Sequence, residues 1–148
     1  MGNSVLGTRV LFNETFGRSI QVSADGAPKY KHGGVTFDWT TVPAIAGADV
    51  TYEDGVVVKI GERALRYGSI VYRMPSGHFG LATDATTLVR GETFIVNETW
   101  LEDDQMSNHP GVIEAGRVFR DRLRVGGAGQ PTLAAVLAVM PGIFLAYD

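Results

Sequence analysis

Turn-forming residues interrupt this chain at short intervals along its whole length. The 148 residues include 19 glycines and 6 prolines, which leave only short uninterrupted segments between them. Such segments suit β-strands, which usually run for about 3–10 residues, better than long helices. With 45% of residues hydrophobic, the chain also has enough apolar side chains to fill a core. The sequence therefore predicts a mainly β fold of short strands and tight turns.

The clearest local signal is a β-hairpin at residues 48–60. Two runs rich in β-branched residues, DVTY and VVVKI, flank Glu53-Asp54-Gly55, and an Asp-Gly pair between such runs is a strong turn signal. Pro43 makes residues 35–45 an edge strand or a strand end. Further strands are predicted at 18–24, 69–73, 93–101, 116–125 and 143–148. This spacing favours a small barrel or sandwich.

One short C-terminal helix is predicted at residues 131–140, between Pro131 and Pro141-Gly142. One face of the helix is formed by larger apolar side chains: Leu133, Val136, Leu137 and Met140. The remaining positions are Ala134, Ala135, Ala138 and Val139. Because the helix has no polar residue after Thr132, we expect it to be enclosed by its own domain or by a neighbouring subunit. The small side chains of Ala135 and Ala138 would permit close approach of another chain, which makes them candidate partner-binding residues.

The N-terminal part of the chain reads as an extended arm. Residues 24–34 collect Gly, Pro, Asp and Lys, which predicts an exposed loop. The expected organisation is therefore an arm and loop at residues 1–34 and a β-rich domain at 35–148, with the arm acting in binding and not in folding. The apolar arm residues could add a strand to the sheet edge of a partner. These candidate partner-binding residues are Val5, Leu6, Val10, Leu11 and Phe12.

A row of arginines occurs in the sequence RVFRDRLRV. On a strand, Arg120, Arg122 and Arg124 would project from one face. Nucleic-acid binding is disfavoured because no aromatic residues interleave on that face and the formal net charge is −3. A solvated face or an acidic protein partner fits the three arginines better.

One acidic stretch raises the question of catalysis. Residues 100–116 gather Glu102, Asp103, Asp104 and His109, which a metal-assisted hydrolase could use. The spacing is that of turns, however, and no second imidazole is placed to support His109. A solvated loop between strands is therefore the favoured interpretation.

Other classes of chemistry find no support in the sequence. The chain has no cysteine, no G-x-S-x-G elbow and no phosphate-binding loop. No apolar run reaches the roughly 18–20 residues that a membrane span needs, and no signal peptide is recognised. We therefore expect no cofactor, no bound metal, no membrane and no nucleic acid.

The order of features from Asp54 onward resembles a known group of proteins. The phrases DGVVVKIGERALRYGSIVYR, LVRGETFIVNETWLEDD and SNHPGVIEAGRVFRDRLRV, followed by a short helix and a terminal strand, are similar to small head proteins of tailed phages. More specifically, they resemble the capsid decoration, or cement, proteins of phages that infect actinobacteria. The resemblance covers about residues 35–148, and residues 1–34 show none.

The resemblance implies a structural role without chemistry. Such proteins are β-rich and usually trimeric, and they sit on the outside of the expanded capsid, where they bridge neighbouring capsid subunits. The implied partner is the major capsid protein, and the implied location is the outer capsid surface of a virion assembled from protein made in the host cytoplasm. Two alternatives stay open: another head–tail or tail component of a phage, and the metal-assisted hydrolase.

Overall fold

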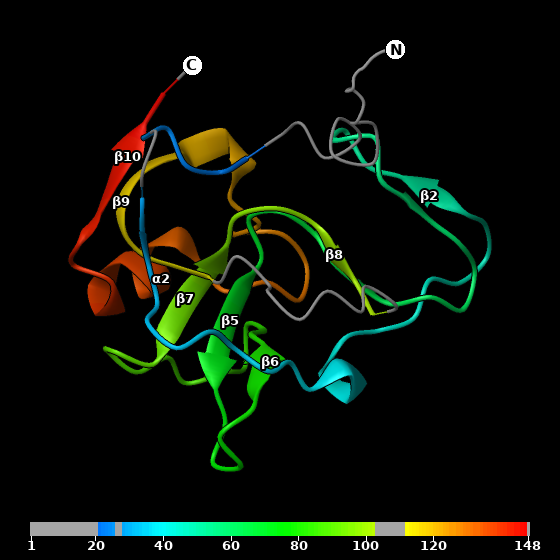
Figure 1. The fold of residues 1–148 in the computed structure, drawn as a ribbon, viewed down its shortest axis with the longest axis horizontal. Coiled ribbons are helices and arrows are strands. Elements are labelled where there is room, and N and C mark those ends of the chain that lie inside the picture. The colour runs from blue at the N-terminus through cyan, green and yellow to red at the C-terminus, as the bar shows by residue number, and fades with distance from the viewer. Residues whose placement is uncertain (1–20, 26–27, 103–111, 148) are drawn as a thin grey trace.

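The computed structural model describes residues 21–25, 28–102 and 112–147 (Figure 1). The chain is mainly β, with 30% of the described residues in strands and 11% in helices, which confirms the predicted class. The strands are β1 (Lys29–Tyr30), β2 (Val50–Thr51), β3 (Val57–Val58), β4 (Ala64–Leu65), β5 (Ile70–Arg73), β6 (Phe79–Leu81), β7 (Thr93–Val96), β8 (Trp100–Leu101), β9 (Val112–Phe119) and β10 (Ile143–Ala146). The helices are the 3-10 turns η1 (Trp39–Thr41) and η2 (Arg120–Arg122) and the α-helix α2 (Leu133–Val139).

A six-stranded sheet forms the centre of the molecule. Its strands follow the order β1-β9-β7-β5-β6 with antiparallel neighbours, and β10 adds to β9 in parallel. Two small antiparallel sheets, β2–β3 and β4–β8, complete the strand pairing. The sheets do not close into a barrel, so the barrel alternative of the sequence prediction is wrong.

The central sheet is buried on both faces. Ile70, Ile95 and Ile113 lie in one apolar cluster, to which α2 also contributes. Their strand neighbours Val71 and Val96 lie in a second cluster, because successive side chains of a strand point to opposite faces. This double burial explains why β7, with the sequence TFIV, is buried at every position rather than at alternate ones.

Several local predictions are confirmed. The hairpin at 48–60 forms as β2 and β3, joined through a turn in which Gly55 takes φ 85°. Residues 69–73 and 143–148 contain β5 and β10, and residues 131–140 contain α2. Thr132 is the N-cap of α2, and its hydroxyl accepts a hydrogen bond from the backbone N–H of Ala135. In the described part of the chain, α2 and the 3-10 turns are all too short to cross a bilayer.

Other strand predictions are wrong. Residues 35–45 form no strand, because the Asp38 side chain accepts a hydrogen bond from the Thr40 N–H and starts η1; only an isolated bridge joins Phe37 to Phe79. The predicted strand 93–101 is split into β7 and β8. The predicted strand 116–125 starts earlier, at Val112, and gives way to η2 after Phe119.

The predicted arm and loop at residues 1–34 overlap the core. Residues 1–20 lie outside the described residues, but Val22 is fully buried in the cluster that includes α2. Ser23 bridges to Val118, and β1 pairs with β9. The prediction of an exposed loop across 24–34 is therefore wrong at β1, which is the edge strand of the central sheet.

A buried amide attaches this N-terminal segment to the sheet. Asn97 is 1% exposed and lies between β7 and β8. Its Oδ1 accepts hydrogen bonds from the backbone N–H groups of Val22 and Ser23, each at 3.0 Å, and its Nδ2 donates to the Tyr30 hydroxyl at 2.9 Å. Since buried polar groups are costly unless they are paired, these bonds fix the path of residues 22–30 along β9.

Candidate functional site

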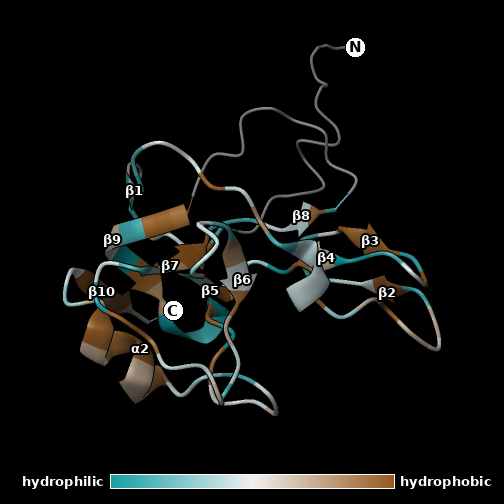
Figure 2. Cartoon of the chain, turned by 90° about the horizontal axis from the view of Figure 1, so that it is seen from below, coloured by the Kyte–Doolittle hydropathy of each residue, from teal (hydrophilic) through white to brown (hydrophobic). Residues whose placement is uncertain are grey.

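The C-terminal strand carries exposed aromatic side chains. Among the described strands, β10 pairs only with β9. Ile143 is buried, but Phe144 is 61% exposed and Tyr147, just beyond the strand, is 74% exposed. Both views place β10 and α2 at the same end of the molecule (Figures 1 and 2).

The helix α2 adds an uncovered face at this end. Val136 and Met140 are buried in the core, whereas Ala134, Ala135 and Ala138 are exposed. Within a single chain the helix is thus enclosed on one side only, unlike the all-round enclosure that its composition predicts. Figure 2 shows α2 in brown and tan, without a hydrophilic residue along it.

We refer to these exposed residues together as the C-terminal surface. It consists of Ala134, Ala135, Ala138, Phe144 and Tyr147. Aromatic side chains bury large areas on association, and small residues on a helix permit close approach of another chain. This arrangement is suited to contact with a macromolecule.

The opposite end of the molecule exposes two aliphatic side chains. Val57 is 47% exposed and Ile60 is 57% exposed. They belong to the β2–β3 hairpin, which lies at the far end from β10 (Figure 1). Isolated exposed aliphatic residues are common on protein surfaces, so this end is the weaker candidate.

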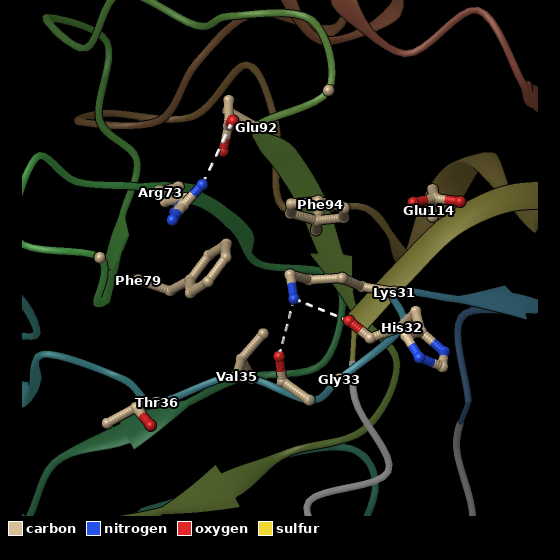
Figure 3. A pocket seen from close by; sticks show the side chains of 13 residues that line it. Lys31, His32, Gly33, Val35, Thr36, Arg73, Phe79, Glu92, Phe94 and Glu114 are labelled. Carbon is tan, nitrogen blue, oxygen red and sulfur yellow. Dashed lines mark hydrogen bonds and ion pairs between the residues drawn. The ribbon is translucent and has the colours of Figure 1, made fainter.

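A groove of about 980 Å³ opens beside the edge of the central sheet (Figure 3). Phe79 and Phe94 line it. The Lys31 ammonium donates hydrogen bonds to the carbonyl oxygens of His32 and Gly34, at 2.9 and 3.0 Å. The Lys31 ammonium is therefore engaged by backbone carbonyl groups.

The other charged groups of the groove are also paired. Arg73 forms an ion pair with Glu92 at 3.6 Å, and Glu114 forms one with Lys29 at 2.9 Å. These ion pairs engage Arg73, Glu92 and Glu114, and His32 also lines the groove.

Sequence reasoning missed a cluster of arginines and tyrosines beside the hairpin. The Arg66 guanidinium lies over the rings of Tyr52 and Tyr67, 4.8 and 5.3 Å from their centroids, and forms an ion pair with Glu53. The Tyr67 hydroxyl donates to Glu53 Oε1 at 2.6 Å. These two hydrogen bonds, from Tyr67 first and then from Arg66, lower the pKa of Glu53 to about 2. Adjacent aromatic and charged residues in TYED and LRYG were the only signal in the sequence.

Arg124 completes this cluster from the C-terminal half of the chain. Its guanidinium lies 5.1 Å from the Tyr67 ring centroid. Burial, followed by the nearby charge of Arg66, lowers the pKa of Arg124. Gly68 helps to place it: this residue takes φ +82°, any side chain there would collide with the Arg122 carbonyl, and its own carbonyl accepts the Arg124 N–H at 2.9 Å.

The predicted arginine row does not share one strand face. Because Arg120–Arg122 form the 3-10 turn η2, the side chains diverge. Arg122 lies over the Phe119 ring and donates to the Gln21 carbonyl at 2.7 Å, whereas Arg124 joins the tyrosine cluster. The prediction of one projecting row at Arg120, Arg122 and Arg124 is wrong in its geometry.

The acidic stretch is only partly described. Glu102 forms an ion pair with Arg63 at 3.6 Å, while Asp103, Asp104 and His109 lie outside the described residues. Within residues 21–25, 28–102 and 112–147, no group of three or more His, Cys, Asp or Glu side chains could hold a metal ion. The candidate arm residues Val5, Leu6, Val10, Leu11 and Phe12 also lie outside the described residues.

Comparison with known proteins adds no relative. No protein-family model, no curated protein and no solved structure matches the chain. Inference of its function therefore depends on its own residues and surfaces.

Proposed function

We propose that this protein is a non-enzymatic structural protein of a phage virion. It binds the outer surface of the capsid as a homo-oligomer, with a trimer favoured, and stabilises the shell by bridging neighbouring subunits of the major capsid protein. The resemblance of residues 35–148 to capsid decoration proteins supports this role. No cofactor, metal, membrane or nucleic acid takes part in it.

The observation that carries the proposal is the C-terminal surface. Phe144 and Tyr147 are mostly exposed, and α2, at the same end of the molecule, has three exposed alanines. Burying one large apolar side chain contributes about 1.5–3 kcal/mol, so leaving two of them in water forgoes a substantial stabilisation that a partner could provide. An interface between copies of the chain would use this stabilisation and would enclose the exposed face of α2.

The N-terminal segment and the arginines fit the same role. The apolar residues between Val5 and Phe12 would add a strand to a sheet edge of the major capsid protein, with main-chain hydrogen bonds supplying affinity. Arg120, the first residue of η2, is partly exposed and could pair with carboxylates of that partner. Many copies on one lattice would turn weak contacts into tight attachment.

Binding to capsids that lack the protein tests the proposal. The wild-type chain should sediment with such capsids, and electron cryo-microscopy should show added density on their outer surface. Phe144→Asp should abolish oligomer formation in size-exclusion chromatography with light scattering and should weaken sedimentation. Ile60→Asp is the matched control, since it places the same charge on an exposed apolar residue at the other end of the molecule. A monomeric wild-type chain that leaves capsids bare would contradict the proposal.

Location separates the remaining alternatives. A head–tail or tail component would appear in virion images at the portal or along the tail instead of over the shell. A metal-assisted hydrolase would carry stoichiometric metal, and replacing Asp103, Asp104 and His109 together with alanine would remove that metal. We expect the triple variant to fold and to bind capsids as the wild-type chain does.

A further inference from the structure

A second cavity, of about 220 Å³, lies beside the arginine and tyrosine cluster. Arg66 and Arg124 both line it, and so do Ser69 and Gln130. Its apolar wall is formed by Val42, Pro43, Ile45, Ile70, Leu81 and Ala82. The cavity thus combines two guanidinium groups with a hydrophobic wall.

The positive charge of this cluster is only partly balanced. Glu53 is the one carboxylate that forms a described ion pair with these two arginines, and it pairs with Arg66. Arg124 donates from Nη2 to the backbone carbonyl of Asp121 at 3.1 Å, not to a side-chain carboxylate. The negative charge of Asp121 acts to raise the pKa of Arg124, but less than that of Glu53 does. Two cations therefore face one directly bound anion.

Donor groups of both arginines are also left without partners. Arg66 Nε and Arg124 Nε are buried and have no hydrogen-bond partner among the described residues. A buried donor without an acceptor is unfavourable. Guanidinium groups bind carboxylates with two parallel N–H···O bonds, often through Nε and one Nη. One additional carboxylate in the cavity would balance the second positive charge.

We propose that this cavity binds an aliphatic carboxylate, held at its charged end by Arg66 and Arg124 and along its alkyl chain by the apolar wall. The volume lies below the roughly 300–1,000 Å³ of sites for drug-sized ligands, which suits a short acid. The apolar wall disfavours a phosphate, which would leave its outer oxygens without donors. The carboxylate could come from a free short-chain acid or from a glutamate side chain of another protein. This site is independent of the capsid role.

Titration followed by nuclear magnetic resonance tests the site on the full chain. The probes are valerate, its uncharged amide valeramide, N-acetylglutamate N-methylamide as a glutamate side chain without free termini, and inorganic phosphate. We expect one or both carboxylates to shift the Nε–H signals of Arg66 and Arg124, and valeramide to bind at least about tenfold more weakly, as expected for loss of a charge-assisted hydrogen bond. Binding of valerate alone identifies a free acid as the source, and binding of the glutamate probe alone identifies a side chain.

Arg124→Gln should weaken carboxylate binding by about tenfold or more. Arg124→Lys keeps the charge but loses the planar fork, so it should also weaken binding, and it serves if the glutamine variant fails to fold. Arg90→Gln, which removes an exposed arginine elsewhere, is the matched control and should leave binding unchanged. The proposal is overturned if neither carboxylate shifts the two arginine signals, if valeramide or phosphate binds as tightly as the carboxylates, or if Arg90→Gln weakens binding as much as the Arg124 variants.

Discussion

The central sheet and the β2–β3 hairpin are held in the molecule by different forces. In the sheet, Val71, Ile95 and Ile113 are fully buried, and apolar clusters cover both faces. The hairpin has two residue pairs in its ladder and leaves Val57 and Ile60 largely exposed. The hairpin does bury Val56 and Val58, but neither belongs to the two apolar clusters that cover the sheet, so its apolar burial is smaller and separate from theirs.

Polar contacts add to this burial at the hairpin turn. Asp54 is 2% exposed; its Oδ2 accepts a hydrogen bond from the Thr99 hydroxyl at 2.5 Å and its Oδ1 accepts one from the Val56 N–H at 3.2 Å. The Thr99 hydroxyl in turn accepts the Tyr67 N–H at 3.1 Å. Glu53 adds its bonds to Tyr67 and Arg66 on the outer side. Stability in the sheet should thus follow buried area, whereas at the hairpin turn it should follow individual hydrogen bonds and charges.

The largest effect is expected from removing the edge of the sheet. A chain that starts at Gly33 lacks Val22 and Tyr30 and leaves the buried Asn97 amide without its partners. Losing one buried valine and leaving a buried polar group unpaired should together lower the free energy of unfolding by about 4 kcal/mol. Urea denaturation of the full and truncated chains measures it. An unchanged midpoint would mean that residues 22–31 add nothing to the sheet.

The next effect contrasts one apolar residue from each region. Ile95→Ala in β7 should lower the free energy of unfolding by about 3 kcal/mol, because it leaves a cavity in the core. Val57→Ala, at a 47% exposed position of the hairpin, should change it by less than about 0.5 kcal/mol. Equal losses in urea denaturation would remove the distinction between the two regions.

The polar anchor of the hairpin should have a smaller and local effect. Asp54→Ala leaves the Thr99 hydroxyl and the Val56 N–H without this acceptor, which should cost about 2 kcal/mol. Hydrogen exchange should become faster at the amides of β2 and β3 and stay slow in β7. Thr99→Val should act through the same network, so the double variant should lose less than the sum of the two single variants. Strict additivity would show that the two side chains act separately.

The smallest effect expected is a loss of stability at acidic pH when Glu53 becomes protonated. The folded-state pKa of Glu53, about 2, lies below its ordinary value of 4.5. Its contribution to stability is therefore fully present above about pH 4.5 and is lost as the pH falls toward 2. Since the Glu53 side chain is 61% exposed, solvent screening should hold this contribution below about 1 kcal/mol.

Comparison with Glu53→Gln isolates this effect from the other carboxylates. The wild-type chain should lose more thermal stability between pH 4.5 and 2 than the variant does, and added salt should reduce the difference. Parallel pH profiles for the two chains would show that Glu53 does not couple the hairpin to Arg66 and Tyr67.

Short sequence patterns correctly predicted the elements that are determined by neighbouring residues in the sequence. The Asp-Gly turn predicted the β2–β3 hairpin, and Pro131, the apolar run after it and Pro141-Gly142 predicted α2. The error at residues 35–45 also had a local cause, since the Asp38 side chain competes with strand formation by bonding the backbone two residues on. Side-chain capping outweighed β-propensity there.

Elements that depend on distant partners could not be predicted. The two-residue strands β1 and β4 exist through pairing with β9 and β8, and no period can be read from two residues. The cavity between Arg66 and Arg124 arises because the chain brings the two arginines together around Tyr67. In the sequence each looks like an ordinary surface cation.

The attachment of the N-terminal segment to β9 has a consequence for how the chain folds. The Val22 N–H donates to the side chain of Asn97, 75 residues later in the sequence. The Asp25 carboxylate accepts a hydrogen bond from the Arg117 N–H, 92 residues later. On the ribosome, the edge position beside β9 cannot be filled until most of the chain has been made. Folds dominated by such distant pairings reach the native state in milliseconds to seconds rather than microseconds. Until β9 has been made, residues 22–25 and β1 lack their partner strand and can pair with other chains, so expression yield should depend strongly on temperature and on the concentration of nascent protein.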